Sequence, residues 1–118
     1  MSEVKIVIPG RPVPYVRMTQ RGKFVKSRAK KYLEYKNSIG WIAKTKIKTP
    51  TSASICITVK VYINGNKQGD ADNYLKTAMD GLNKIAYIDD IQVIKASVEK
   101  IPCDKKEERM EISIKEVG

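Results

Sequence analysis

A chain of 118 residues has the length of one domain, because two independent domains of half that size would each be marginally stable. Its hydrophobic fraction of 42% is near the globular average, which argues against disorder. No apolar run approaches the roughly 20 residues that span a bilayer, and no apolar signal region is present. We therefore expect a single cytoplasmic domain over residues 1–118, without a membrane partner.

The chain contains no histidine, so it cannot form a histidine-activated nucleophile, a histidine general base or a histidine-ligated metal site. Its net charge of +10 is unevenly distributed. Residues 1–69 contain fifteen lysines and arginines against two acids, whereas residues 70–118 contain eight against eleven. The basic first part favours nucleic-acid binding. Cys56 and Cys103 lack CxxC spacing, so we expect reduced thiols and no zinc site.

The apolar pattern predicts the order strand, helix, strand, helix, strand, strand. Alternating apolar residues predict strands over about 4–8, 53–63, 91–101 and 110–117. Apolar residues at helical spacing predict helices over about 27–45, capped by Ser27, and 71–82. We expect an α+β fold with one mixed, largely antiparallel sheet of about four strands and two covering helices. A polar hairpin loop over 102–108 is expected to join the last two strands.

The alternation also predicts which side chains face the core. The third strand is expected to turn Ile94, Ala96 and Val98 inward. The first helix is expected to bury one broad arc, and the second helix another. The residues of the first arc are Tyr32, Tyr35, Ile39, Ile42 and Ala43, and those of the second are Ala71, Leu75, Ala78, Met79 and Leu82.

The segment from Arg11 to Lys26 is rich in proline and basic residues, which predicts a stiffened loop or a short hairpin around Arg21-Gly22. Its cations, with those that crowd the start of the first helix, suit a phosphate backbone, and cations at a helix N-terminus indicate an external anion. The candidate DNA-binding residues are Arg11, Arg17, Arg21, Lys23, Lys26, Arg28, Lys30 and Lys31.

Three aromatic residues have open interpretations. Tyr15 and Phe24 either stack on nucleobases or pack onto the core. Trp41 lies off the main apolar arc of its helix, which favours a core or subunit contact, with base stacking as the alternative.

Four acids stand between residues 69 and 92, with Asp70 and Asp72 at a helix start and Asp89 and Asp90 at a strand start. Helix capping can account for Asp70 or Asp72 but not for the second pair. The helix carries the chain about 18 Å away. Eight extended residues can return it by roughly 26 Å. Asp90 can therefore lie beside the first pair.

Three or four gathered carboxylates need a cation between them, and oxygen ligands alone select Mg²⁺ or Mn²⁺. Beside a basic DNA-binding surface, such an ion is suited to phosphodiester hydrolysis, because it lowers the pKa of a bound water and offsets transition-state charge. Lys76, one turn past Asp72, is a candidate to steady the phosphate. The alternative for Lys76 is an ion pair with Asp72 or Asp80.

The pattern Asp70-x-Asp72-Asn73-x-x-Lys76, followed by Asp89-Asp90-x-Gln92-Val93, resembles the RusA-type Holliday-junction resolvases. These are small endonucleases often encoded by bacterial phages and prophages. The resemblance implies that Asp70, Asp72 and Asp90 bind the metal and catalyse cleavage together with Lys76. Asn73 and Asp89 are expected to support this site without binding the metal.

The resemblance also implies a homodimer that cuts two symmetry-related strands of a four-way DNA junction with Mg²⁺ or Mn²⁺, in recombination and repair. It departs from some family members at Gly69, where they have a basic residue. Two other functions stay open. One is a basic nucleic-acid-binding protein that no longer cleaves, with its acids as caps and solubility charge. The other is an assembly protein that uses Trp41 and binds its partner independently of salt.

Overall fold

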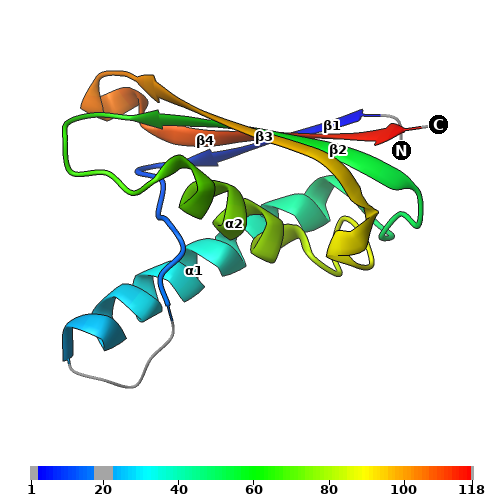
Figure 1. Cartoon of the computed structure of the whole chain (residues 1–118), viewed down its shortest axis with the longest axis horizontal. Helices are drawn as coiled ribbons and strands as arrows, with labels where there is room; N and C mark the ends of the chain where they lie inside the picture. Colours follow the sequence, from blue (N-terminus) through cyan, green and yellow to red (C-terminus); the bar gives the residue numbers. More distant parts are fainter. Residues whose placement is uncertain (1–2, 18–22, 118) are drawn as a thin grey trace.

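The computed structural model describes residues 3–17 and 23–117, without the side chains of residues 23–26. Its strands are β1 (Glu3–Pro9), β2 (Ser54–Ile63), β3 (Val93–Pro102) and β4 (Arg109–Val117), and its α-helices are α1 (Lys23–Lys46) and α2 (Ala71–Leu82). Short 3₁₀ helices, η1 (Asp90–Gln92) and η2 (Lys105–Glu107), precede β3 and β4. Both α-helices lie on one face of the sheet (Figure 1). This arrangement confirms the predicted α+β fold and element order.

The strands are ordered β1-β4-β2-β3 within the sheet. β4 pairs antiparallel with both β1 and β2, whereas β3 pairs parallel with β2. Parallel neighbours need a crossover connection, and α2 provides it between β2 and β3. The prediction of a hairpin over 102–108 is therefore wrong, because β2 lies between the two strands that this segment joins.

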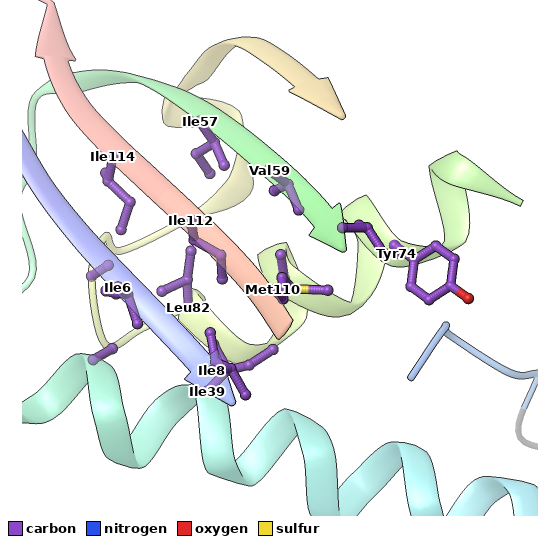
Figure 2. Packing of buried hydrophobic residues seen from close by; sticks show 14 of the residues in the cluster. Ile6, Ile8, Ile39, Ile57, Val59, Tyr74, Leu82, Met110, Ile112 and Ile114 are labelled. Atoms are coloured by element: carbon purple, nitrogen blue, oxygen red, sulfur yellow. The ribbon is translucent and has the colours of Figure 1, made fainter. Parts of the chain in front are cut away.

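The core lies between the sheet and the two helices. β2 buries every second residue from Ile55 to Ile63, which confirms the predicted alternation. Figure 2 shows Ile39 of α1 and Leu82 of α2 beneath apolar side chains of β1, β2 and β4. Each fully buried aliphatic side chain of this kind contributes roughly 1.5–3 kcal/mol.

α1 begins at Lys23, four residues before the predicted cap, so Ser27 lies inside the helix. Residues 23–26 contain no helix breaker after Gly22, which allows the earlier start. The predicted buried arc is otherwise confirmed, with Ile42 partly buried. Trp41 is 71% exposed, so a core position for it is wrong. The hairpin predicted around Arg21-Gly22 lies outside the described residues.

β3 departs from its predicted packing. Ile94 is 59% exposed and Ala96 is exposed, whereas Val98 is partly buried against the core. The pairing of β2 with β3 shifts register between Ile55 and Cys56, and this shift leaves Ile94 as the extra residue of a bulge. Ala96 pairs with Ile57 but belongs to the edge strand of the sheet, which has no strand on its other side.

α2 has its predicted bounds, Ala71–Leu82. Ala78 and Leu82 are buried as expected, but Tyr74, Thr77 and Gly81 are buried as well. The two polar residues can be buried because their hydroxyls are hydrogen-bonded: Tyr74 accepts from the Gly69 amide at 3.0 Å, and Thr77 donates to the Asn73 carbonyl at 3.0 Å. The buried face of α2 therefore differs from the predicted apolar arc, because it includes these two polar residues and a glycine.

Cys56 and Cys103 are free thiols, as predicted. Neither α1 nor α2, nor any other helix in the described ranges, is long and apolar enough to cross a bilayer.

Candidate active site and nucleic-acid surface

The first acidic pair stands at the exposed N-terminal end of α2. Asp70 is the N-cap residue in an extended conformation, but its side chain makes no capping hydrogen bond. Asp72 lies in the first helical turn. Among the described residues, neither carboxylate has a hydrogen-bond or ion-pair partner. The capping role that the sequence allowed for Asp70 is thus unused, and both carboxylates remain available to a ligand.

The second acidic pair is held by the protein. The Asp89 carboxylate accepts from the Ile91 amide at 3.0 Å and forms a reciprocal capping box with Gln92 at the start of η1. The Asp90 carboxylate lies 2.9 Å from the hydroxyl of Tyr87, which also lies 2.9 Å from the Met79 carbonyl of α2. Burial raises the pKa of Tyr87, and the hydrogen bond to Asp90 raises it further. Tyr87 therefore stays protonated and can donate.

Gln92 anchors this second pair, and sequence reasoning gave it no such role. Its side-chain carbonyl accepts from the amides of Ile88 and Asp89 at 2.8 and 2.9 Å. Its side-chain amide donates to the carbonyls of Thr51 and Ala53, both at 2.8 Å. The box spacing of an acid followed by glutamine three residues later is the signal that could have revealed it.

One protomer does not bring Asp90 back beside Asp70 and Asp72. The return segment is folded rather than extended. The backbone amide of Lys84 donates to the Tyr87 carbonyl at 2.7 Å, and Asn83 forms an isolated β-bridge with Tyr87. Asp90 is consequently linked through Tyr87 to Met79, and the rise of α2 from Asp72 to Met79 is about 10 Å at 1.5 Å per residue. Across residues 3–17 and 23–117, no three acidic or cysteine side chains are grouped so that they could hold a metal ion.

Lys76 is exposed on α2, and its Nζ lies 3.9 Å from the centroid of the Tyr15 ring. Neither alternative ion pair, with Asp72 or with Asp80, is formed. Tyr15 packs edge-on against Tyr32 at 5.2 Å between ring centroids, and its amide donates to the Asn73 carbonyl at 3.0 Å. The Tyr15 ring is therefore packed within the protein. This contact holds the ammonium group of Lys76 against the first half of α2.

Tyr32 and Asp80 continue this polar contact along α2. The Tyr32 hydroxyl donates to the Asp80 carboxylate at 2.5 Å. Burial raises the pKa of Tyr32, and the hydrogen bond to Asp80 adds to the rise. The Asp80 carboxylate is thus hydrogen-bonded to a residue of α1.

A basic depression adjoins the first acidic pair. It is a pocket of about 710 Å³ between residues 11–16, the start of α1 and the loop before α2. The residues of it that matter for charge and shape are Arg11, Arg28, Lys31, Lys67, Gly69 and Tyr74. Gly69 directly precedes Asp70, so an anion bound in the depression would lie next to the acidic pair.

Gly69 is fixed by close packing. A Cβ at this position would lie 2.7 Å from Cβ and 2.9 Å from Cγ of Pro14, which is closer than real contacts allow. The Lys100 side chain donates to the Gly69 carbonyl at 3.2 Å and brings a further cation that sequence reasoning missed. Pro14 thus explains why glycine occupies position 69 in this chain.

Arg11 is bound internally. Its guanidinium forms an ion pair with Glu108 at 2.5 Å and donates to the carbonyls of Asn64 and Lys67. Glu108 is only 8% exposed. The hydrogen bond from the Asn64 amide lowers the pKa of its carboxyl group, and the hydrogen bond from Arg11 lowers it further. Arg11 therefore holds the turn that leads to Asp70.

The other predicted DNA-binding residues vary in position. Three of them, Arg28, Lys30 and Lys31, are exposed on the first half of α1. Arg17 is exposed as well, and it lies three residues after Pro14. Arg21 lies outside the described residues, as do the side chains of Lys23 and Lys26. Where they are described, the predicted cations other than Arg11 are free to contact solvent or DNA.

A basic depression is the electrostatic feature expected of a surface that binds nucleic acids. The model of the family described as Endodeoxyribonuclease RusA matches residues 9–115. The chain belongs to this family. Membership implies an endodeoxyribonuclease that resolves Holliday junctions. A search of curated proteins found no match to the chain.

Proposed function

We propose that this protein is a metal-dependent endonuclease that resolves four-way DNA junctions as a homodimer, with its chemistry at the N-terminal end of α2. The observation that carries the proposal is the free state of Asp70 and Asp72 beside the basic depression. Carboxylates that the fold does not use, next to a surface that attracts phosphates, are suited to bind a divalent cation.

Lys76 is the third member of this site. Its contact with Tyr15 confines the ammonium near Asp72 without neutralising it, since an aromatic ring carries no net charge. We assign Lys76 to the phosphate that is cut. Asn73 supports the arrangement through its backbone, which accepts from Tyr15 and Thr77.

Asp90 requires a second copy of the chain in this proposal, because one protomer does not gather the three acids. Apolar side chains surround the Asp89-Asp90 pair: Ile88 is 51% exposed, Ile91 85% and Ile94 59%. A solvent-exposed apolar patch of this kind favours association. A partner that docks there would approach Asp90.

The first experiment measures cleavage of a synthetic four-way junction by the full chain, with Mg²⁺, with Mn²⁺ and with a chelator. We expect paired cuts in opposite strands that require the metal, and little cutting of linear duplex. Junction binding without metal-dependent cuts would instead support the non-catalytic DNA-binding alternative.

A mixing experiment tests whether a second copy supplies Asp90. Asp72→Asn and Asp90→Asn are each expected to be inactive, but a mixed dimer would contain one wild-type combination if the acids come from different subunits. Mixing the two variants should then restore nicking of one strand. Continued inactivity, with subunit exchange verified, would place all three acids in one subunit.

A further inference from the structure

A second pocket lies at the other end of α2, and nothing in the proposed active site uses it. It has a volume of about 390 Å³ and lies between the second half of α1 and the C-terminal end of α2. We call it the Trp41 pocket. Of its lining residues, those that matter here are Lys36, Trp41, Lys44, Asp80, Asn83 and Lys84.

Two glycines set the shape of this pocket. A Cβ on Gly40 would lie 2.8 Å from Cδ1 of Ile85, and one on Gly81 would lie 2.8 Å from Cβ of Ile39. The glycines therefore let α1 and α2 approach closely at this point. Trp41 follows Gly40 directly, yet it remains 71% exposed at the pocket.

The pocket is positively charged. Lys36, Lys44 and Lys84 have no ion-pair partner among the described residues, and the one acid present, Asp80, accepts from Tyr32. Lys44 lies 5.3 Å from the centroid of the Trp41 ring. Cations around an exposed aromatic ring are the combination that binds single-stranded nucleic acid, in which the ring stacks on a base and the lysines contact phosphates.

Lys84 adds a separate observation. It adopts a φ of 69°, the left-handed conformation in which glycine or asparagine usually follows a helix. The chain leaves α2 by a turn at this residue, and Lys84 lines the pocket there.

The pocket lies on the same face of α2 as the candidate active site. Asp72, Lys76, Asp80 and Asn83 are spaced by four, four and three residues, so they form one stripe along the helix. The last two line the Trp41 pocket. From Asp72 to Asn83 the helix advances about 16 Å at 1.5 Å per residue. This distance corresponds to about five nucleotides at 3.4 Å along one strand.

We propose that the Trp41 pocket binds an unpaired nucleotide of branched DNA, with the base stacked on Trp41 and its phosphates held by Lys36, Lys44 and Lys84. The inference rests on the proposed function, since it places this nucleotide on the strand that passes the acidic pair. A symmetric subunit contact is disfavoured at this surface, because it would gather the three lysines of both copies in one interface.

Trp41 is the only tryptophan in the chain, so its fluorescence reports on this pocket alone. In the test, the full chain is titrated separately with an oligothymidine, a blunt duplex and a four-way junction, and a chelator is present throughout. Tryptophan emission is measured in each titration, and the anisotropy of labelled DNA measures binding in parallel. We expect saturable quenching by the oligothymidine and the junction, and much less by the duplex. Trp41→Ala should weaken oligothymidine binding about tenfold or more, and Trp41→Phe clearly less.

A matched pair of variants tests the lysines. Replacing Lys36, Lys44 and Lys84 by glutamine should reduce the slope of log affinity against log salt by about 2 for a single strand. The same change at Lys5, Lys60 and Lys115, exposed residues on the sheet, should reduce it clearly less. Equal reductions in the two triple variants would overturn the proposal.

Three further outcomes would also overturn it: unchanged emission when anisotropy shows saturation, equal quenching by duplex, or an emission shift that follows protein concentration without DNA. The last would identify a subunit contact. Junction cleavage by the wild type separates this inference from the proposed function. Quenching without cleavage would refute the function alone, and cleavage without quenching would refute the pocket alone.

Discussion

The two acidic pairs occupy opposite environments, although each stands at the start of a helix. At α2 the cap residue Asp70 makes no side-chain hydrogen bond and Asp72 is free, whereas at η1 Asp89 caps the helix and Asp90 contacts Tyr87. The difference follows from what each helix needs. α2 is stabilised by its buried face, while η1 has three residues, none of them buried, and depends on its cap. The carboxylates that packing leaves free are those available for function.

The largest expected effect on stability is at Gln92. Gln92→Ala removes two hydrogen bonds to the carbonyls of Thr51 and Ala53 and two from the amides of Ile88 and Asp89, which should lower the free energy of unfolding by about 2–3 kcal/mol. Urea unfolding measures this. Gln68→Ala is the matched control, because the Gln68 amide donates only to the Gly65 carbonyl, and it should change stability by less than about 0.5 kcal/mol. Equal losses would show that Gln92 does not anchor the second pair.

The next effect is at Tyr87, which joins Asp90 to α2. Tyr87→Phe keeps the buried ring but removes the hydroxyl, and it should lower the free energy of unfolding by about 1 kcal/mol.

Tyr87 should also affect the response to alkali. Because its folded-state pKa is raised above the unfolded value of about 10, its contribution is present below pH 10 and is lost as the pH rises above it. Urea unfolding at pH 8 and pH 10.5 should show a smaller alkaline loss in Tyr87→Phe than in the wild type. The same alkaline loss in both proteins would contradict the assigned burial of Tyr87.

The smallest effect compares the two cap residues. Asp89→Ala should cost about 1 kcal/mol, as expected for a cap that is in use. Asp70→Ala should cost less than about 0.5 kcal/mol, because no capping hydrogen bond is lost. Thermal unfolding of the two variants at one pH provides the comparison, and a larger loss for Asp70→Ala would reverse our distinction between the pairs.

Local patterns predicted most of the fold. The alternation of β2 and the bounds of α2 follow from periodicity, because residues near in sequence share one face of a strand or helix. Strand neighbours could not be predicted in this way. The insertion of β2 between β3 and β4, and the bulge at Ile94, depend on contacts between distant segments.

The candidate site was predicted in part. The sequence identified Asp70, Asp72 and Lys76 on the exposed side of α2, where the structure places them. It treated the return of Asp90 as a question of reach, and an extended chain is long enough. The observed turn at Lys84 depends on its amide hydrogen bond to the Tyr87 carbonyl and on burial of Tyr87, which residue spacing does not reveal.

The most direct test of the central claim is the rate of junction cleavage by Asp72→Asn with Mg²⁺ at saturating enzyme. The matched control is Asp104→Asn, an exposed acid that starts η2 and likewise makes no capping hydrogen bond. We expect Asp72→Asn to bind the junction and keep its thermal stability while its cleavage rate falls at least about 1,000-fold, a loss of about 4 kcal/mol of transition-state stabilisation. Asp104→Asn should cleave at the wild-type rate. Cleavage by Asp72→Asn within a few-fold of the wild type would contradict a catalytic role for the free acidic pair.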